Sequence, residues 1–330
     1  MAGSMHSMRS IDAPNGVVTG GRIGAYHPST DGPRPHLHGP VLLAADGSEL
    51  AGNAARVALA VAGHAGATLQ VVSVVDTRGV PIPPPLDLAI GLADDIVGPA
   101  VHEAQASDVR TALAAALDTT VDWPVHVAIG TPAQEIAQRA ADGLVGLVVV
   151  GLRRHGALGR ALQDETALRV MRRATCPVLA VTPALASLPR HVVVGLDFDR
   201  ASEQAARLAL ELLAPDGTLT LAHAPSGLWH EAETAEHRIH ALGVEAAFDA
   251  LLHDLAPPPG VVVERVVLEE PARRARPADR LLAFAERTHA DLLALGSRRH
   301  GRLERWLLGS VVTDVVRDGS VSVLVVPPDA

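Results

Sequence analysis

The chain contains two copies of one sequence pattern. Gly296-Ser-Arg-Arg-His-Gly leads on to Val323-Leu-Val-Val, and 145 positions earlier Gly151-Leu-Arg-Arg-His-Gly leads on to Val178-Leu-Ala-Val. This tandem repeat within 330 residues indicates two domains, each long enough to bury a core of its own. The copies differ at the positions that would hold a phosphate group, so the pattern predicts one working site and one lost site.

Composition and periodicity narrow the fold class. Aromatic residues make up 2% of a chain that is 48% hydrophobic, so the cores must consist of Ala, Val and Leu. Short Val-rich runs alternate with helical segments in both halves, which is typical of parallel strands joined by helical crossovers. We therefore expect an α/β fold with a parallel sheet in each half.

The same alternation predicts where the elements and domains lie. In the first half we expect strands at 41–45, 69–75, 125–129, 145–150 and 178–181, with helices at 49–63, 90–117, 132–141 and 164–173. In the second half we expect strands at 191–196, 218–223, 261–268, 291–295 and 321–326. Residues 1–39 lack an apolar period and read as a disordered leader. The first domain then covers 40–182, the linker 183–190 and the second domain 191–328.

Charge and residue types exclude several classes of function. A formal net charge of −9 disfavours nucleic-acid binding, which depends on clustered cations. The chain has no lysine, so neither a Schiff-base lysine nor a P-loop lysine is available. The lone Cys176 excludes an internal disulfide and a thiolate zinc cage. No apolar run is long enough to cross a bilayer, and we expect a cytoplasmic protein that uses no membrane.

The second half carries a candidate phosphate site. A Gly-rich loop that leads into a helix at the carboxyl edge of a parallel sheet presents free backbone N–H groups and the positive end of the helix dipole. Gly309-Ser310 fits this description: Gly309 lets a phosphate approach the backbone, and Ser310 either caps the helix or donates its hydroxyl to the phosphate. Gly296 ends the preceding strand and gives the chain room to turn.

An acidic residue follows the first strand of each half. Asp46 follows the first strand of the first domain, and Asp197 holds the same place in the second. A carboxylate there faces the sugar or base of a nucleotide at the switch point of the sheet, or it caps the next helix.

An insertion separates the two halves. Gly130-Thr-Pro132 in the first half corresponds to Glu269-Glu-Pro271 in the second, and Arg273-Arg-Ala-Arg is then inserted before the next helix. These arginines form either a solvated loop or a phosphate contact.

These motifs together resemble the universal stress protein family in its tandem form. The family pattern is Gly, two residues, Gly, nine residues and Gly-Ser, after a strand-end Asp and before a closing Val-rich strand. The resemblance covers nearly everything from Val41 to Pro327. It implies two Rossmann-like domains of the adenine nucleotide alpha hydrolase type, each with a five-stranded parallel sheet. Some members of the family bind ATP, and others lack the motif.

Carried over residue by residue, the resemblance predicts a nucleotide site in the second half. Arg299 stands where the family has its second glycine, and it either strains the backbone by about 1 kcal/mol or clasps phosphate with its guanidinium. The predicted nucleotide-binding residues are Leu196, Asp197, Ala224, Gly296, Arg298, Arg299, Gly309, Ser310, Val311 and Val312.

The first half departs further from the pattern. It keeps Asp46, Val74 and Gly151, but Arg154 replaces the second glycine, and Asp164 and Glu165 replace Gly-Ser. Two carboxylates at a helix N-terminus satisfy its dipole themselves, and each repels a phosphate charge by roughly 1 kcal/mol even when well solvated. We therefore predict a degenerate first site that does not bind ATP.

Our leading hypothesis is a nucleotide-responsive stress protein that binds one ATP, with or without Mg, in its second domain. The family implies an intramolecular pseudo-dimer or a homodimer, with a protein partner that the sequence does not name. We expect no enzymatic activity beyond slow ATP hydrolysis, since no general base is recognisable. The alternative is a nucleotide-free scaffold for protein interactions, in which both sites have decayed. An enzyme of a related nucleotide hydrolase fold ranks last, because no catalytic set is apparent.

Overall fold

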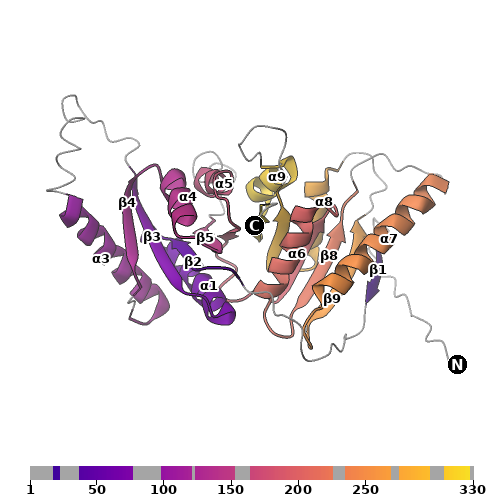
Figure 1. The fold of residues 1–330 in the computed structure, drawn as a ribbon, viewed down its shortest axis with the longest axis horizontal. Helices are drawn as coiled ribbons and strands as arrows, with labels where there is room; N and C mark the ends of the chain where they lie inside the picture. Colours follow the sequence, from indigo (N-terminus) through magenta and orange to yellow (C-terminus); the bar gives the residue numbers. More distant parts are fainter. Residues whose placement is uncertain are drawn as a thin grey trace. The chain divides into compact units, whose positions relative to one another are not determined.

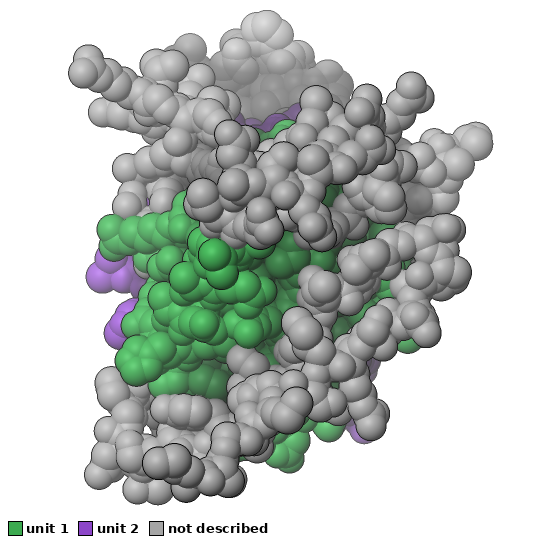
Figure 2. Space-filling model, turned by 90° about the vertical axis from the view of Figure 1, so that its right-hand side faces the viewer, with its two compact units in different colours: residues 1–36, 188–299, 308–329 green, residues 37–187, 300–307, 330 purple. Residues whose placement is uncertain are grey.

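The computed structural model describes residues 18–22, 37–76, 98–120, 123–152, 164–225, 235–268, 275–297 and 308–327 (Figure 1). These residues form two compact units, coloured separately in Figure 2. We call the unit within 37–187 the N-terminal unit. The C-terminal unit combines residues 18–22 with the described residues from 188 onward.

The N-terminal unit alternates strands and helices along the chain. Its elements are β2 (Val41–Ala44), α1 (Glu49–Ala65), β3 (Leu69–Asp76), α3 (Gly98–Leu117), β4 (Val125–Gly130), α4 (Pro132–Asp142), β5 (Leu147–Gly151), α5 (Asp164–Met171) and β6 (Val178–Val181). Its strands are all parallel, in the order β6-β5-β2-β3-β4. The order reverses direction at β2, so β2 and β5 flank the switch point of this sheet.

The C-terminal unit repeats this arrangement. Its elements are β7 (His191–Leu196), α6 (Arg200–Leu212), β8 (Thr218–His223), α7 (Ala235–Leu255), β9 (Val262–Leu268), α8 (Pro277–Arg287), β10 (Leu292–Gly296), α9 (Ser310–Asp318) and β11 (Ser322–Val326). The parallel strands follow the order β9-β8-β7-β10-β11, with the switch point between β7 and β10. The predicted pair of five-stranded parallel sheets is confirmed.

Two layers of helices cover each sheet. In the N-terminal unit α1 packs on α3, and α4 packs on α5. Because crossover connections are right-handed, the two connections that precede the switch and the two that follow it place their helices on opposite faces. The central strands are buried on both sides: β5 contributes Leu147 and Val148, and β10 contributes Leu292 and Leu293, all with no exposed surface. The described core is built mainly from Ala, Val and Leu, with Phe248 and Phe284 as buried aromatic residues, and small side chains suit this close approach of helices to parallel strands.

The structure corrects the expectation of a leader without regular structure. Residues Val18–Arg22 form β1, which pairs antiparallel with β9 from Val18 beside Leu268 to Arg22 beside Glu264. The segment that precedes the first domain in sequence therefore supplies an edge strand to the sheet of the C-terminal unit. The N–H and C=O groups along β9 would otherwise be open to pairing with another chain.

A second correction concerns the alignment of the two halves. Pro132 is the first residue of α4, and the first residue of α8 is Pro277 rather than Pro271. Both helices are 11 residues long, so each position of α4 matches the residue 145 places later in α8. The extra residues of the second half therefore lie between β9 and α8.

Candidate functional site

The C-terminal unit presents the described members of its predicted site at the carboxyl edge of the sheet. Strand β7 ends at Leu196, β10 ends at Gly296, and α9 begins at Ser310. The connection after β7 and the connection after β10 lead to opposite faces of the sheet. This leaves a crevice at the carboxyl ends of the two strands, where sheets of this kind bind ligands. Ala224 follows the last residue of the neighbouring β8.

The turn after β7 holds Asp197 in a defined position. Its Oδ1 accepts a hydrogen bond from the N–H of Asp199 at 3.3 Å, while Phe198 between them has a φ of 61°. Asp199, not Asp197, caps α6 by accepting the N–H of Ser202 at 2.8 Å. The alternative in which Asp197 caps the next helix is therefore wrong, and its exposed carboxylate lies at the switch point.

The start of α9 is open. Gly309 is the N-cap residue and provides no side-chain hydrogen bond to the helix, and a Cβ placed on it would meet no atom of the described residues within 4 Å. Ser310 is the first helical residue and is exposed, so the alternative in which Ser310 is the N-cap is wrong. The first N–H groups of a helix, here those of Ser310, Val311 and Val312, have no intrahelical acceptor and form a natural anion site.

Gly296 has a different role from the one expected. A Cβ on Gly296 would lie 2.4 Å from the backbone nitrogen of Ser202 and 2.5 Å from the carbonyl carbon of Ala201. The first turn of α6 thus packs directly on the end of β10, and only glycine leaves enough space. The residue permits close approach of two elements rather than a turn of the chain.

Sequence reasoning missed two polar side chains beside this site. The Nδ1–H of His223 donates to the carbonyl of Leu196 at 2.8 Å, because that carbonyl can only accept. Arg280 of α8 donates to the carbonyl of Leu268 at 2.7 Å and to that of Pro225, which follows Ala224. Comparing α4 with α8 in the correct register would have drawn attention to this residue, since Glu135 occupies the same position in the first half.

Of the three inserted arginines, Arg276 lies within the described residues. Arg276 bonds Asp279 at 2.9 Å and Asp314 of α9 at 2.7 Å, so its guanidinium ties α8 to α9. The hydrogen bond from Arg276 lowers the pKa of the Asp279 carboxyl. Arg273 and Arg274 lie outside the described residues, as do the predicted site residues Arg298 and Arg299.

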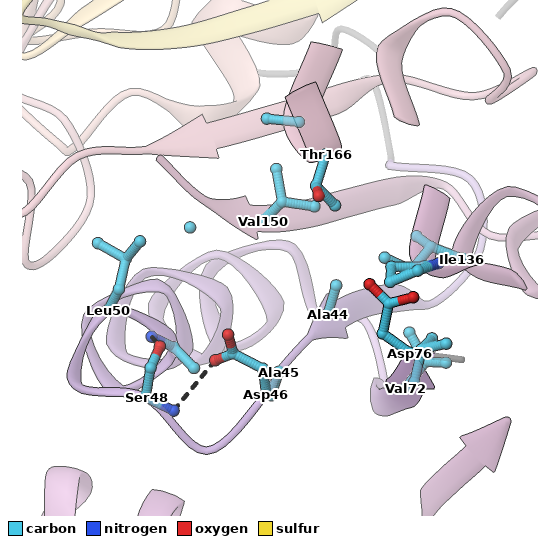
Figure 3. Close-up of a pocket in the computed structure, with 15 residues that line it drawn as sticks. Ala44, Ala45, Asp46, Ser48, Leu50, Val72, Asp76, Ile136, Val150 and Thr166 are labelled. Atoms are coloured by element: carbon cyan, nitrogen blue, oxygen red, sulfur yellow. Dashed lines mark hydrogen bonds between the residues drawn. The ribbon is translucent and has the colours of Figure 1, made fainter. Parts of the chain in front are cut away.

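In the N-terminal unit the corresponding edge encloses a cavity of about 500 Å³ (Figure 3). It is lined by Ala44, Ala45, Asp46, Ser48, Leu50, Ala51, Val72, Val74, Asp76, Pro132, Ile136, Val150, Gly151, Thr166 and Ala167. Three residues of the predicted degenerate site, Asp46, Val74 and Gly151, are thereby brought together. Asp164 and Glu165 begin α5, the helix that contributes Thr166 to the wall, and Arg154 lies outside the described residues.

The turn at the cavity matches the one in the C-terminal unit. Asp46 Oδ1 accepts the N–H of Ser48 at 3.0 Å, and Gly47 has a φ of 79°. Ser48 then caps α1 by accepting the N–H of Ala51 at 3.3 Å, so Asp46 is not the cap either. Sequence reasoning did not include Asp76 or Thr166, because neither belongs to the repeated motif.

The described part of the chain gives little support for a metal site, a reactive thiol or a membrane-spanning helix. Within it, no three His, Cys, Asp or Glu side chains gather as a metal site would require. Burial raises the pKa of the Cys176 thiol to about 11, so its thiolate is scarce at neutral pH. Among the helices that the structure describes, none combines the length and apolar character needed to span a bilayer.

Comparison with known proteins agrees with this architecture. The model of the universal stress protein family matches residues 38–182 and again residues 189–327. The chain belongs to the universal stress protein family. The tandem resemblance expected from the motifs is thereby confirmed.

Relatives within the family are of moderate similarity. A universal stress protein of Mycobacterium tuberculosis is 32% identical over 192 residues, which cover 54% of this chain and 61% of that protein. One from Mycolicibacterium smegmatis is 30% identical over 195 residues, covering 55% and 62% respectively. The chain thus matches about three fifths of the length of these relatives.

Solved structures show the same fold. The crystal structure of a universal stress protein from Archaeoglobus fulgidus superposes with a TM-score of 0.54 at 20% identity, covering 88% of this chain and 98% of that one. A protein of unknown function from Pseudomonas aeruginosa superposes with a TM-score of 0.51 at 17% identity, covering 88% and 92%. At these identities the likeness concerns the fold alone.

Proposed function

We propose that the C-terminal unit binds an adenine nucleotide, ATP, and that this universal stress protein acts as a nucleotide-responsive regulatory protein. The observation that carries the proposal is the open start of α9. Among the described residues Gly309 leaves space above the first N–H groups of the helix, and it supplies no side chain to cap them. A phosphate group provides the acceptors and the negative charge that this position lacks.

The other site residues fit the remaining parts of the ligand. The carboxylate of Asp197 lies at the switch point, where it would accept hydrogen bonds from the sugar or base. The backbone after β7 and β8, at Leu196 and Ala224, would border the base. Mg, when present, would enter with the triphosphate, since this ion usually binds through phosphate oxygens and keeps several waters.

The proposed role is binding rather than catalysis. The described residues around the start of α9 include no histidine or carboxylate that we can assign as a general base toward a terminal phosphate. Arg276 forms ion pairs with two acids near this position, Asp314 in the first half of α9 and Asp279 in the first turn of α8. We expect ATP turnover to be slow at most, with nucleotide occupancy as the regulatory signal.

The experiment is a calorimetric titration of ATP against the wild-type chain and the variant Gly309→Asp. Because a side chain at this position meets open space and Asp is a favoured N-cap, the variant should fold with equal or slightly higher stability. Its carboxylate should weaken ATP binding by more than tenfold, at roughly 1 kcal/mol for each nearby phosphate charge. The result that contradicts the proposal is a folded Gly309→Asp protein with wild-type affinity.

The variant Gly309→Asn is the matched control. Asn also caps helices but carries no charge, so it separates competition for the N–H groups from electrostatic repulsion. Gly309→Asn should lose less affinity than Gly309→Asp. Wild-type affinity weaker than millimolar would instead favour the nucleotide-free scaffold.

A further inference from the structure

A buried histidine contacts the residues on both sides of Asp197. His223 ends β8 and lies opposite Leu196, the last residue of β7, in the strand register. Its Nδ1–H donates to the carbonyl of Leu196 at 2.8 Å, and its ring packs on Phe198 with centroids 5.1 Å apart. Leu196 precedes Asp197 and Phe198 follows it. One side chain from the neighbouring strand therefore holds the chain before and after this aspartate.

Phe198 adopts a backbone conformation that its side chain disfavours. Its φ is 61°, in the left-handed region where a bulky residue is an outlier. Strained residues of this kind persist where the surrounding structure holds them, and they are concentrated at ligand sites and switch regions. Here the ring of Phe198 also meets the buried ring of Phe248 in α7 edge to face at 5.1 Å. Two of the three phenylalanines of the chain thus lie at this turn, in a core built mainly from smaller residues.

The matching turn of the N-terminal unit carries glycine where the C-terminal unit carries Phe198. In both turns Oδ1 of the aspartate accepts the N–H two residues further on, as Figure 3 shows for Asp46 and Ser48. Gly47 adopts its φ of 79° without strain. The ring of Phe198 is therefore not needed to form such a turn. What the ring contacts add is a restraint on its movement.

The histidine also has a different residue at its place in the N-terminal unit. The strand registers put Ser73 of β3 at the position of His223. Ser73 is buried and accepts a hydrogen bond from Nε2 of Gln105 in α3 at 3.1 Å, which links its strand to a helix. His223 instead links the end of its strand to the end of the neighbouring strand. The link between strand ends thus belongs to the unit whose last helix has an open start.

The contacts of His223 concern the nucleoside half of the proposed ligand. They lie at the ends of β7 and β8, whereas the helix start at Gly309 follows β10 in the chain. In a site at the switch point the phosphates lie at the helix N-terminus, and the sugar and base lie against the strand ends. A turn that is already fixed loses less freedom when it binds a ligand, which raises the affinity.

We propose that His223 is a positioning residue for the nucleoside half of the site. By holding Leu196 and Phe198 it keeps the end of β7 and Asp197 in the arrangement that receives the sugar and base. It thereby favours a nucleoside triphosphate over inorganic triphosphate, through contacts with the turn rather than with the ligand. This inference rests on the proposed binding of ATP by the C-terminal unit.

The test compares ATP with inorganic tripolyphosphate, which lacks the nucleoside half, by calorimetry on the full-length protein. His223→Phe keeps a ring against Phe198 but removes the donor, and it should weaken ATP binding roughly tenfold, as loss of one orienting hydrogen bond does. The affinity of this variant for tripolyphosphate should stay within about twofold of wild type. His223→Asn offers an N–H at the same number of bonds from Cα and should recover part of the affinity for ATP.

A double-mutant cycle with ATP alone separates positioning from a general loss of structure. Phe198→Gly relieves the backbone strain but removes the ring, so it should also weaken ATP binding. Because both side chains act on one turn, His223→Phe combined with Phe198→Gly should lose much less than the product of the two single losses. His223→Phe combined with Gly309→Asn should lose the full product, since these changes act on separate halves of the ligand.

Ser73→Ala, at the same register position in the N-terminal unit, is the control and should leave the affinity for ATP unchanged. Circular dichroism reports whether each variant is folded, and Phe198→Gly carries the comparison of the two ligands if His223→Phe does not fold. Three results would overturn the proposal: wild-type ATP affinity in folded His223→Phe, equal losses for ATP and tripolyphosphate, or independent losses from His223→Phe and Phe198→Gly. Wild-type protein that binds neither ligand would instead show that the proposed function itself is wrong, and this inference with it.

Discussion

Two glycines of the same motif, Gly296 and Gly309, have different physical roles. Gly296 lies against the backbone of α6, and Gly309 faces open space. The variant Gly296→Ala must push a helix away from its sheet, which should destabilise the protein by about 1 to 3 kcal/mol. Urea unfolding of Gly296→Ala measures this loss, and Gly309→Ala serves as the control, with an expected change below about 0.5 kcal/mol. Equal stabilities of the two variants would contradict these roles.

Glu211 should make the free energy of unfolding fall as the pH rises. Burial raises the pKa of its carboxyl to about 7, so between the unfolded value near 4.3 and about 7 the folded state binds more protons. The free energy of unfolding therefore falls as pH rises through this window. Glu211→Gln should stabilise the protein at pH 8 by about 1 kcal/mol, discounted for solvent screening, with little effect at pH 4.5.

Unfolding of this variant by urea at a series of pH values provides the measurement. Glu103→Gln, on the exposed surface of α3, is the control and should show no such trend. A gain from Glu211→Gln that is equal at pH 4.5 and pH 8 would show that the carboxyl is not desolvated.

Sequence reasoning found residues fixed by the repeat and missed those fixed by packing. Asp46, Asp197 and Gly309 follow from the motif. Phe198 does not, although it adopts the same positive φ as Gly47. Its backbone strain of roughly 1 kcal/mol is offset by ring contacts with His223 and Phe248, both with centroids 5.1 Å away.

At the scale of elements, strands were predicted well where a buried Val-rich run defined them. The expected ranges of β7 and β8 match the observed ones, because both strands are largely buried, each begins at a polar residue, and the apolar run stops at Asp197 after β7 and at His223 in β8. The strand β1 was missed, since Val18-Thr-Gly-Gly-Arg22 has two glycines and no apolar period. It is a strand only because the edge of β9 pairs with it, and such tertiary contacts override local propensity.

Deletion of residues 1–22 tests the role of β1. Without this segment the N–H groups of β9 that face β1 lose their partners, so their hydrogen exchange should accelerate. Exchange in β4, the matching strand of the N-terminal unit, is the internal control and should not change. Unaltered protection of β9 would indicate that β1 does not pair with it in solution.

Each unit also contains polar contacts that no pattern predicts. Asn53 of α1 is buried and donates to the carbonyls of Thr182 at 3.1 Å and Leu185 at 2.6 Å, which anchors the end of the unit to its first helix. Asn53→Ala removes both hydrogen bonds in a buried place, although the carbonyl of Thr182 still accepts the N–H of Leu185, and should destabilise the protein by about 1 to 3 kcal/mol in urea unfolding. Gln138→Ala, on the exposed side of α4, is the matched control. Equal losses from the two variants would argue against this role of Asn53.

For the whole molecule, the two units share one fold but differ in the residues at the carboxyl edges of their sheets. The topology and the turn after the first strand are shared, whereas the residues at the start of the last helix differ in charge. Sequence comparison revealed this difference because it lies within the motif. It did not reveal the cavity of the N-terminal unit, whose wall comes from three strands and three helices, β2, β3, β5, α1, α4 and α5, that are far apart in the chain.

The stoichiometry of ATP binding tests the central claim most directly. Calorimetry of the full-length chain at saturating ATP should give one nucleotide per chain, and Gly309→Asp should bind that nucleotide more than tenfold more weakly. Two nucleotides per chain, or one that folded Gly309→Asp binds with wild-type affinity, would contradict the account.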